Sequence, residues 1–288
     1  MHSGERGAHL VWRHASVGGR RVNYGVAGVG LPVLFLHGWA LGARSYKRAM
    51  KRLVRLGCRV VAPALPGFGG SAQLAGRDTT LAGYAAWADA FLDEVGVDEP
   101  ALVAGHSLGG AVAAQFAHDF PDRVAHLVLI NAIGGGVWSA AAGTVRSMAE
   151  RPLWDWAVTL SRDISGASAA PVLRVVAEEA LPNLAANPLA VWRAAAIARR
   201  ADLCAELSGI RRAGVPVTVV SSEGDLVVPK ASFEAICGQL GVEGRLVEGG
   251  HSWLIADPDA FVEAVLPAVA AARASRAAMA RLPLAASQ

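Results

Sequence analysis

The sequence predicts a single α/β domain built on a mostly parallel β-sheet, with a helical insertion late in the chain. Short, continuous apolar runs have the length and composition of strands that are buried on both faces. Segments with helical spacing of apolar residues separate these runs, and this alternation favours a parallel sheet with helices on both faces. The alternation stops over residues 134–209 and then resumes. The predicted central strands are residues 32–36, 59–62, 101–104, 124–130 and 216–221.

The remaining elements follow from local patterns. Gly18 and Gly19 separate two alternating segments, which predicts an antiparallel hairpin over residues 15–27 at the start of the sheet. Apolar residues at helical spacing predict a helix over residues 81–95, with Thr80 as its N-cap. The other predicted elements are an amphipathic helix at 43–56, a loop rich in proline and glycine at 63–71, a weaker strand at 244–247 and a closing helix at 258–273.

Residues 134–209 contain half of the eight tryptophans and several prolines, and their readable segments are helical. We therefore expect a helical cap inserted into the core domain. The predicted organisation is a core formed by residues 15–133 and 210–273, a cap at 134–209 and a flexible, alanine-rich tail at 274–288.

Composition restricts the class of protein. Hydrophobic residues make up 53% of the 288 residues, but glycine, proline and charge interrupt each apolar run. None reaches the roughly 18 residues of a membrane span, so stable membrane insertion is not expected. The net charge is +3, and the basic residues between positions 44 and 55 are interpreted as a solvated helix face, because no nucleic-acid recognition motif accompanies them.

Three widely spaced cysteines form neither a disulfide framework nor a metal motif. No P-loop, dinucleotide-binding glycine pattern or metal-ligand spacing is present, so no metal and no cofactor is expected. Residues 1–14 lack the apolar region of a secretory signal, so we expect a soluble, cytoplasmic protein. A homodimer is compatible with the sequence.

The stretch from Val103 to Gly110 contains the clearest functional signal. It joins an apolar strand-like run to a helix-like run, and the pattern Gly105-x-Ser107-x-Gly109 falls at the turn between them. This is the pattern of a nucleophile elbow, in which a sharp turn raises a serine hydroxyl to a helix N-terminus and requires neighbours without bulk. Ser107 is therefore the candidate nucleophile.

A serine hydroxyl needs a base, and an imidazole base needs a carboxylate to hold its tautomer. His251 alone of the eight histidines lies downstream of the cap, and Asp225 follows both a predicted strand and a glycine. Both positions lie beyond strand ends, where sites form in parallel sheets, so they can converge on Ser107. The competing carboxylates are Glu223, Asp202 and Asp257, whereas Asn131, after another strand, carries no charge.

An oxyanion formed on the substrate needs backbone donors. The N–H of Leu108, directly after the serine, and that of Trp39, in the loop after residues 32–36, are the predicted oxyanion hole. His37 and His106 lie close to the predicted site. We interpret both as fastening glycine-rich turns through hydrogen bonds, rather than as catalytic bases.

These motifs resemble those of the α/β-hydrolase superfamily over residues 16–272. The resemblance implies an α/β-hydrolase fold with a mostly parallel, eight-stranded sheet and a cap after the sixth strand. It also implies a catalytic triad in which Ser107 is the nucleophile, Asp225 the acid and His251 the base. The matching stretches are Leu36-His37-Gly38-Trp39, Leu65-Pro66-Gly67-Phe68-Gly69-Gly70-Ser71, Gly105-His106-Ser107-Leu108-Gly109-Gly110, Gly224-Asp225-Leu226-Val227-Val228-Pro229 and Gly250-His251.

Differences between this sequence and related groups of enzymes restrict the subfamily that it resembles. Ala64 stands where the family often has aspartate, which bears on how the following loop is tied down. Ser107 argues against epoxide hydrolases and haloalkane dehalogenases, which use an aspartate nucleophile. Enzymes that cleave carbon–carbon bonds of ring-fission products often have asparagine where His106 stands. The Gly105 to Gly110 stretch is more similar to esterases, lipases and thioesterases.

The leading interpretation is a serine hydrolase that cleaves a carboxylic ester, or a related lactone or thioester, of a largely apolar small molecule through an acyl-enzyme. One alternative is a carbon–carbon bond hydrolase, or a cofactor-free lyase or oxygenase, on the same fold. Another is a non-catalytic binding module. The cap tryptophans either line an apolar substrate pocket or pack the cap onto the core. These tryptophans are Trp138, Trp154, Trp156 and Trp192.

Overall fold

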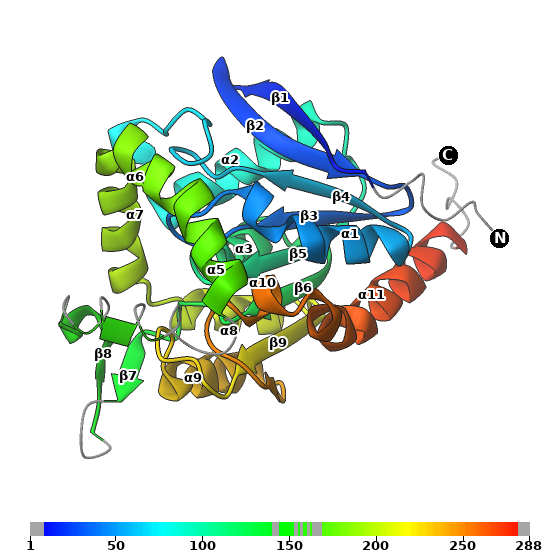
Figure 1. The fold of residues 1–288 in the computed structure, drawn as a ribbon. Coiled ribbons are helices and arrows are strands. Elements are labelled where there is room, and N and C mark those ends of the chain that lie inside the picture. The colour runs from blue at the N-terminus through cyan, green and yellow to red at the C-terminus, as the bar shows by residue number, and fades with distance from the viewer. Residues whose placement is uncertain are drawn as a thin grey trace.

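The computed structural model describes residues 9–139, 144–152, 155, 158–159, 162 and 169–281. Eight strands of this part form one sheet in the order β1-β2-β4-β3-β5-β6-β9-β10 (Figure 1). The β1–β2 and β2–β4 pairs are antiparallel, and the pairs from β4 to β10 are parallel. The strands are β1 (Val11–Val17), β2 (Arg20–Ala27), β3 (Leu31–Leu36), β4 (Cys58–Pro63), β5 (Ala101–His106), β6 (Val124–Ile130), β9 (Val217–Ser222) and β10 (Arg245–Val247).

The central strands are buried on both faces, as their continuous apolar sequences predict. Every residue of β3, β5 and β6 is buried. Val33 and Phe35 belong to the apolar cluster on one face of the sheet, and Leu34 and Leu36 to the cluster on the other. This alternation follows from the period of two along a strand. The predicted fold class is confirmed.

Helices cover the two faces. One cluster contains apolar residues of α1 and α11, and the other contains those of α2, α3, α8 and α9. Thr80 caps α2 as predicted, since its hydroxyl accepts a hydrogen bond of 3.0 Å from the N–H of Gly83. None of the described helices is both long and apolar enough to cross a bilayer. The helices are α1 (Lys47–Arg55), α2 (Leu81–Glu94), α3 (Leu108–Asp119), α8 (Cys204–Arg212), α9 (Lys230–Leu240), α10 (Trp253–Ala256) and α11 (Pro258–Arg281).

A long insertion follows β6, at the left of Figure 1. It opens with a two-stranded antiparallel sheet, which the sequence did not predict, and continues with helices. We use the name cap for the described residues between 134 and 203. Its elements are β7 (Val137–Ser139), β8 (Val145–Ser147), a 3₁₀-helix at Met148–Glu150, α5 (Ala169–Val175), a π-helix at Val176–Ala180, α6 (Leu181–Ala186) and α7 (Pro188–Arg200).

Two boundaries differ from the sequence expectation. The predicted junction between residues 209 and 210 falls inside α8, whose Leu207 and Ile210 pack in the core cluster. Helix α11 continues to Arg281, beyond the predicted end at 273, because alanine favours helix whether or not the segment is packed. Helix α9 was not predicted.

Candidate active site

Ser107 occupies the sharp turn between β5 and α3. Its φ of 55° and ψ of −117° lie outside the regions that a residue with a Cβ favours. The turn is held by the N–H of Ser107, which donates to the carbonyl of Ile130 (3.0 Å), and by its carbonyl, which accepts from the N–H of Gly110 (3.0 Å). A Cβ at Gly105 would collide with the carbonyl of Gly109, so only glycine lets strand and helix approach this closely. The turn therefore has the geometry of a nucleophile elbow.

The two predicted oxyanion donors lie on either side of this turn. Leu108 is the first residue of α3, and Trp39 lies in the segment after β3, which we call the Trp39 loop (residues 37–42). Within the described part of the chain, neither backbone N–H donates a hydrogen bond. The Trp39 loop approaches the serine closely, because a Cβ on Gly38 would lie 3.4 Å from the Cβ of Ser107. The assignment of these two N–H groups to an oxyanion hole stays a prediction.

Asp225 lies just beyond β9 with both carboxylate oxygens hydrogen-bonded. Its Oδ1 accepts from the N–H groups of Val227 and Val228, each at 2.8 Å. Its Oδ2 accepts from Asn131 Nδ2 (2.5 Å) and lies 2.9 Å from His251 Nδ1. Burial raises the pKa of this carboxyl, but the charge of His251 and the hydrogen bonds from His251, Asn131 and Val228 outweigh it. The pKa of Asp225 therefore lies below its ordinary value, and the group is a carboxylate at neutral pH.

The three competing carboxylates have other positions. Glu223 is exposed, and Asp202 Oδ1 accepts from the N–H of Cys204. Asp257 Oδ1 accepts from two N–H groups in the first turn of α11, as a helix cap does. Asp225, in contrast, pairs with His251.

Asn131, the residue after β6, donates a hydrogen bond to Asp225. It is 1% exposed and has a positive φ of 43°. Its Nδ2 donates to Asp225 and to the hydroxyl of Ser222 (2.8 Å), and its Oδ1 accepts from the indole of Trp253 (2.7 Å). Sequence reasoning rejected Asn131 as an acid and missed it as the partner of the acid, although its place at a strand end was visible.

His106 ties the elbow to the loop that carries His251. Its Nε2 lies 2.9 Å from the carbonyl oxygen of His251, and its Nδ1 lies 2.8 Å from the hydroxyl of Tyr46. Burial, followed by the charge of His251, lowers the pKa of His106 to about 3, so the ring is neutral at pH 7. A carbonyl only accepts, so Nε2 holds the proton and Nδ1 accepts from Tyr46. The Tyr46 oxygen also accepts from the N–H of Gly38 (3.1 Å). One chain of hydrogen bonds thus links the Trp39 loop, the elbow and the loop that carries His251.

His37 is fixed in the same way. Burial lowers its pKa to about 4, so this ring is also neutral. Its Nδ1 donates to the carbonyl of Gly38 (2.8 Å), and its Nε2 accepts from the N–H of Leu65 (2.8 Å). Both rings fasten turns, in agreement with the interpretation from sequence, and neither has a nitrogen left for a substrate.

His251 lies beside the elbow. The ring centroids of His106 and His251 are 4.8 Å apart, and the backbone of His251 is bonded to the residue that precedes the serine. Ser107 is 8% exposed. The structure therefore places the Asp225–His251 pair next to the strained turn that carries Ser107.

Arg151 connects the cap to the segment that follows Asp225. Its side chain is 2% exposed, and it pairs with Asp155 (2.5 Å). The guanidinium donates to the carbonyls of Leu226 (2.8 Å) and Val227 (2.5 Å). A charge this buried requires such partners. No sequence pattern pointed to this contact, because its partners lie about 75 residues away.

The cap tryptophans give a mixed result. Trp154 and Trp156 lie outside the described residues. Trp138 in β7 is half-buried, and its indole N–H is buried with no hydrogen-bond partner in the described part of the chain. Trp192 on α7 is 65% exposed, because it lies on the helix face opposite the buried Val191 and Ala194. Most of the Trp192 side chain therefore faces solvent, and its place in the substrate site stays a prediction.

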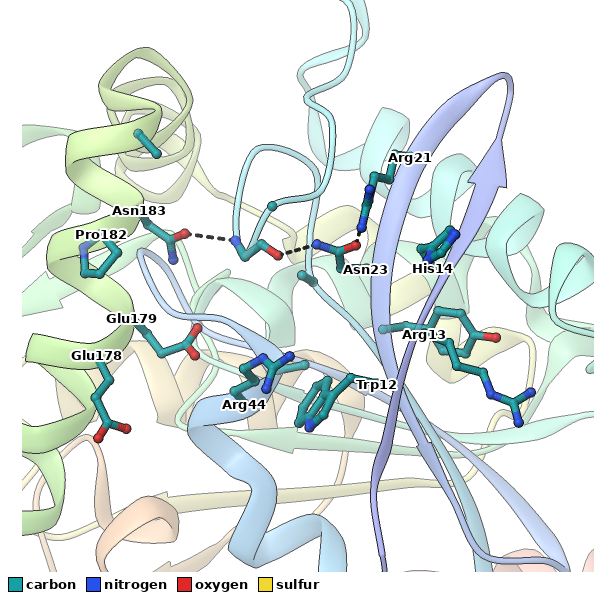
Figure 2. A pocket seen from close by; sticks show the side chains of 16 residues that line it. Trp12, Arg13, His14, Arg21, Asn23, Arg44, Glu178, Glu179, Pro182 and Asn183 are labelled. Carbon is teal, nitrogen blue, oxygen red and sulfur yellow. Dashed lines mark hydrogen bonds between the residues drawn. The ribbon is translucent and has the colours of Figure 1, made fainter.

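A cavity of about 540 Å³ opens between the β1–β2 hairpin and the cap, and Ser107 is not among its lining residues. In Figure 2, Arg44 lies between Trp12 and Glu179, and its guanidinium carbon is 4.3 Å from the centroid of the Trp12 ring. The guanidinium groups of Arg13, Arg21 and Arg44 lie apart from one another in this view. The cavity is therefore mixed in charge and separate from the serine.

Comparisons with known proteins agree with this architecture. A family model described as "Alpha/beta hydrolase family" matches residues 33–264 of the 288. The chain belongs to the alpha/beta hydrolase family. This hydrolase is 32% identical over 246 residues to the pimeloyl-[acyl-carrier protein] methyl ester esterase of Aromatoleum aromaticum, covering 79% of this chain and 93% of that protein.

Two further similarities are more limited. The hydrolase is 35% identical over 127 residues to the 2-hydroxy-6-oxo-2,4-heptadienoate hydrolase of Pseudomonas putida, which covers 43% of this chain and 45% of that protein. The solved structure of an N-acyl homoserine lactone degrading enzyme superposes with a TM-score of 0.72 at 22% identity, covering 88% and 99% of the two chains. The latter likeness concerns the fold alone.

Proposed function

We propose that this alpha/beta hydrolase cleaves a carboxylic ester, or a related lactone or thioester, of a largely apolar small molecule through an acyl-enzyme on Ser107. The observation that carries the proposal is the Asp225–His251 pair, joined at 2.9 Å, beside a serine held at a φ of 55°. The esterase relative, similar over most of both chains, supports the choice of ester chemistry.

In the acylation step, the Ser107 hydroxyl attacks the substrate carbonyl carbon while His251 Nε2 accepts the hydroxyl proton. The Asp225 carboxylate holds the Nδ1 proton of His251 and stabilises the imidazolium that forms. The former carbonyl oxygen becomes an oxyanion, which accepts hydrogen bonds from the N–H groups of Trp39 and Leu108. The imidazolium then protonates the departing alkoxide, and the acyl group remains on Ser107.

Deacylation repeats these roles with water as the nucleophile. His251 removes a proton from the water, which attacks the acyl carbon, and the same two N–H groups stabilise the second oxyanion. Collapse of this intermediate returns the proton to Ser107 and releases the carboxylic acid. The low pKa of Asp225 keeps the partner of His251 charged throughout.

The first experiment is fluorophosphonate labelling combined with turnover of short p-nitrophenyl esters and of methyl esters. Labelling of Ser107 with ester turnover supports the proposal. Labelling with turnover of only a diketone or cyanohydrin supports a carbon–carbon hydrolase or a lyase, the class that the partial match to the dienoate hydrolase brings into consideration. If neither occurs, the chain is a binding module.

The apolar character of the substrate is tested by a chain-length series of p-nitrophenyl esters. Each additional methylene that the site buries should improve binding by up to about 0.8 kcal/mol until the site is full. We expect activity to peak at a medium acyl or aromatic ester. A rate that falls steadily from acetate onwards, or a preference for charged acyl groups, would contradict this.

A further inference from the structure

Asn183 reaches from α6 of the cap onto two loops of the core. Its Nδ2 donates to the carbonyls of Ala40 (2.9 Å) and Leu41 (3.1 Å), and its Oδ1 accepts from the N–H of Gly69 (2.8 Å). Figure 2 shows the side chain pointing from its helix toward the loop after β4. The residue is 8% exposed. All of these partners are backbone groups of the core, so a cap side chain completes hydrogen bonding that the core does not supply itself.

The contact falls on a strained part of the Trp39 loop. Ala40 has a φ of 59°, a conformation that a residue with a Cβ adopts when its surroundings hold it there. Asn183 binds the carbonyl of this residue, which directly follows Trp39. Without that hydrogen bond, the strain at Ala40 favours relaxation toward a negative φ. That rotation turns the peptide between Trp39 and Ala40, and Trp39, which carries the N–H, moves with it.

The cap contacts the Trp39 loop at two further points. The indole N–H of Trp39 donates to the carbonyl of Val191 in α7 (2.8 Å). The carboxylate of Glu179, in the π-helix before α6, packs so closely over Gly42 that a Cβ at this position would collide with it. A π-helix turn changes the direction in which the following residues face, and here it precedes the segment that carries Asn183.

We propose that Asn183 is a positioning residue for the oxyanion hole. It acts through the Trp39 loop, which it holds in the conformation that presents the Trp39 N–H to the substrate oxygen. This inference rests on the proposed function, in which that N–H is an oxyanion donor. Its consequence is that the cap, besides covering the site, completes the part of the core that stabilises the transition state.

The test compares Asn183→Ala and Asn183→Asp with Asn187→Asp. Asn187 lies four residues further along the cap, where its Oδ1 caps α7 by accepting from the N–H of Ala190 (3.3 Å). Its Nδ2 donates to the carbonyl of Gly67 (3.4 Å), in the loop after β4 and outside the Trp39 loop. Aspartate caps a helix equally well, so this control introduces the same charge without loosening the Trp39 loop. Asn183→Asp places an acceptor against the carbonyls of Ala40 and Leu41, and Asn183→Ala removes the donors without adding charge.

Removal of one oxyanion donor costs about 10²- to 10³-fold in kcat, and a displaced donor should cost less. We expect both Asn183 variants to lower kcat/KM for a p-nitrophenyl ester by about 10- to 100-fold, mainly through kcat. The affinity for a trifluoromethyl ketone, which forms a tetrahedral adduct with the serine, should fall by the same factor. Asn187→Asp should stay within about twofold of wild type on both measures.

Hydrogen exchange supplies a readout that does not require turnover. The backbone amide of Leu41, which donates to the carbonyl of Gly38 (3.3 Å), should exchange faster in Asn183→Ala and at an unchanged rate in Asn187→Asp, with protection of β5 and β6 kept in both. Unchanged exchange in the loop, or a loss of turnover at undiminished ketone affinity, overturns the positioning role while leaving the proposed function intact. Wild-type protein that forms no covalent adduct with a fluorophosphonate or the ketone overturns both.

Discussion

Two buried asparagines form hydrogen bonds at the ends of β6 and β3, the strands that flank β5. They differ in the part of the chain to which they belong. Asn131 follows β6 and supports Asp225 from within the core, through partners on β9 and α10. Asn183 belongs to the cap and supports the Trp39 loop after β3. The acid side of the site, around the proposed acid Asp225, is therefore built by neighbouring strands. The oxyanion side, around the proposed donor Trp39, depends on a cap segment that docks onto the core.

This difference determines which changes should act on which side. A change in the strands should disturb the Asp225–His251 pair, and a change in the cap should disturb the backbone donor at Trp39. Arg151 shows that the division is not absolute, because it reaches from the cap to the carbonyls of Leu226 and Val227. It binds the backbone after Asp225, however, and not the carboxylate.

Ser107→Ala should have the largest effect, because it removes the group on which both sides converge. We expect kcat to fall by about five to six orders of magnitude, and fluorophosphonate labelling to disappear. The fold should persist, since the alanine keeps the Cβ and the backbone bonds of the turn. Mass spectrometry of the labelled protein, with circular dichroism as the control, checks this. Residual labelling at another residue would contradict the assignment of the nucleophile.

The acid side is broken most directly by Asp225→Asn. The amide cannot stabilise an imidazolium and can hold the wrong tautomer of His251, so kcat should fall by about 10³- to 10⁴-fold. His251→Ala should cost nearly as much as the serine change. Ester turnover measured across pH checks both variants. If Asp225→Asn kept the wild-type rate, another carboxylate would be the acid, and Glu223→Gln would be the next variant to measure.

Asn131→Ala sharpens the comparison with Asn183. It leaves Asp225 and the Trp253 indole each without one partner, which should cost about 1–3 kcal/mol in the free energy of unfolding. Loss of the Asn131 hydrogen bond also raises the pKa of Asp225 and weakens its hold on His251, so kcat/KM should fall by about 10- to 100-fold. In contrast to Asn183→Ala, exchange of the Leu41 amide should not change. Faster exchange there would show that the two sides are coupled.

A smaller effect, on the pH dependence of stability, is expected from His126, which is buried in β6. Burial lowers the pKa of His126 to about 4, and its Nε2 lies 2.8 Å from the hydroxyl of Thr218. The unfolded chain takes up a proton below its ordinary pKa of about 6.5, while the folded chain does not. The free energy of unfolding is therefore unaffected by protonation of His126 above pH 6.5. Between pH 6.5 and pH 4 it falls by about 1.4 kcal/mol per pH unit, because protons bind to His126 in the unfolded chain only.

His126→Asn should therefore flatten the decline of stability between pH 6.5 and 5. Urea unfolding at both pH values measures the slope, with His118→Asn as the control on an exposed, partly solvated histidine of α3. An unchanged slope in His126→Asn would mean that this ring is protonated in the folded protein.

Trp192→Ala should have the smallest effect. Because 65% of this residue is exposed on α7, we expect its removal to change kcat/KM for medium-chain esters by less than about twofold. The same chain-length series that tests the apolar site measures this. A selective loss of long-chain activity would instead place Trp192 in the substrate site.

The contrast between the two asparagines also explains what could be predicted from sequence. The strands, the elbow and the positions of Asp225 and His251 follow from local patterns, because the carboxyl ends of parallel strands meet at one edge. Asn131 was visible at such an end, but its partners were not. Asn183 and Arg151 gave no signal, since their partners in the core are backbone carbonyls 142 and 75 residues away, and every residue type carries the same carbonyl.

The direct pairing of β6 with β9, with Leu127 opposite Val217, has a consequence for exchanging parts between relatives. The cap leaves and re-enters the core between adjacent strands, so a chimera can receive a different cap without altering the register of the sheet. Folding of such a chimera is a weak criterion of success, however. A transplanted cap must bring its own substitute for Asn183, or the recipient will fold with an intact serine, histidine and aspartate and a loosely held oxyanion donor.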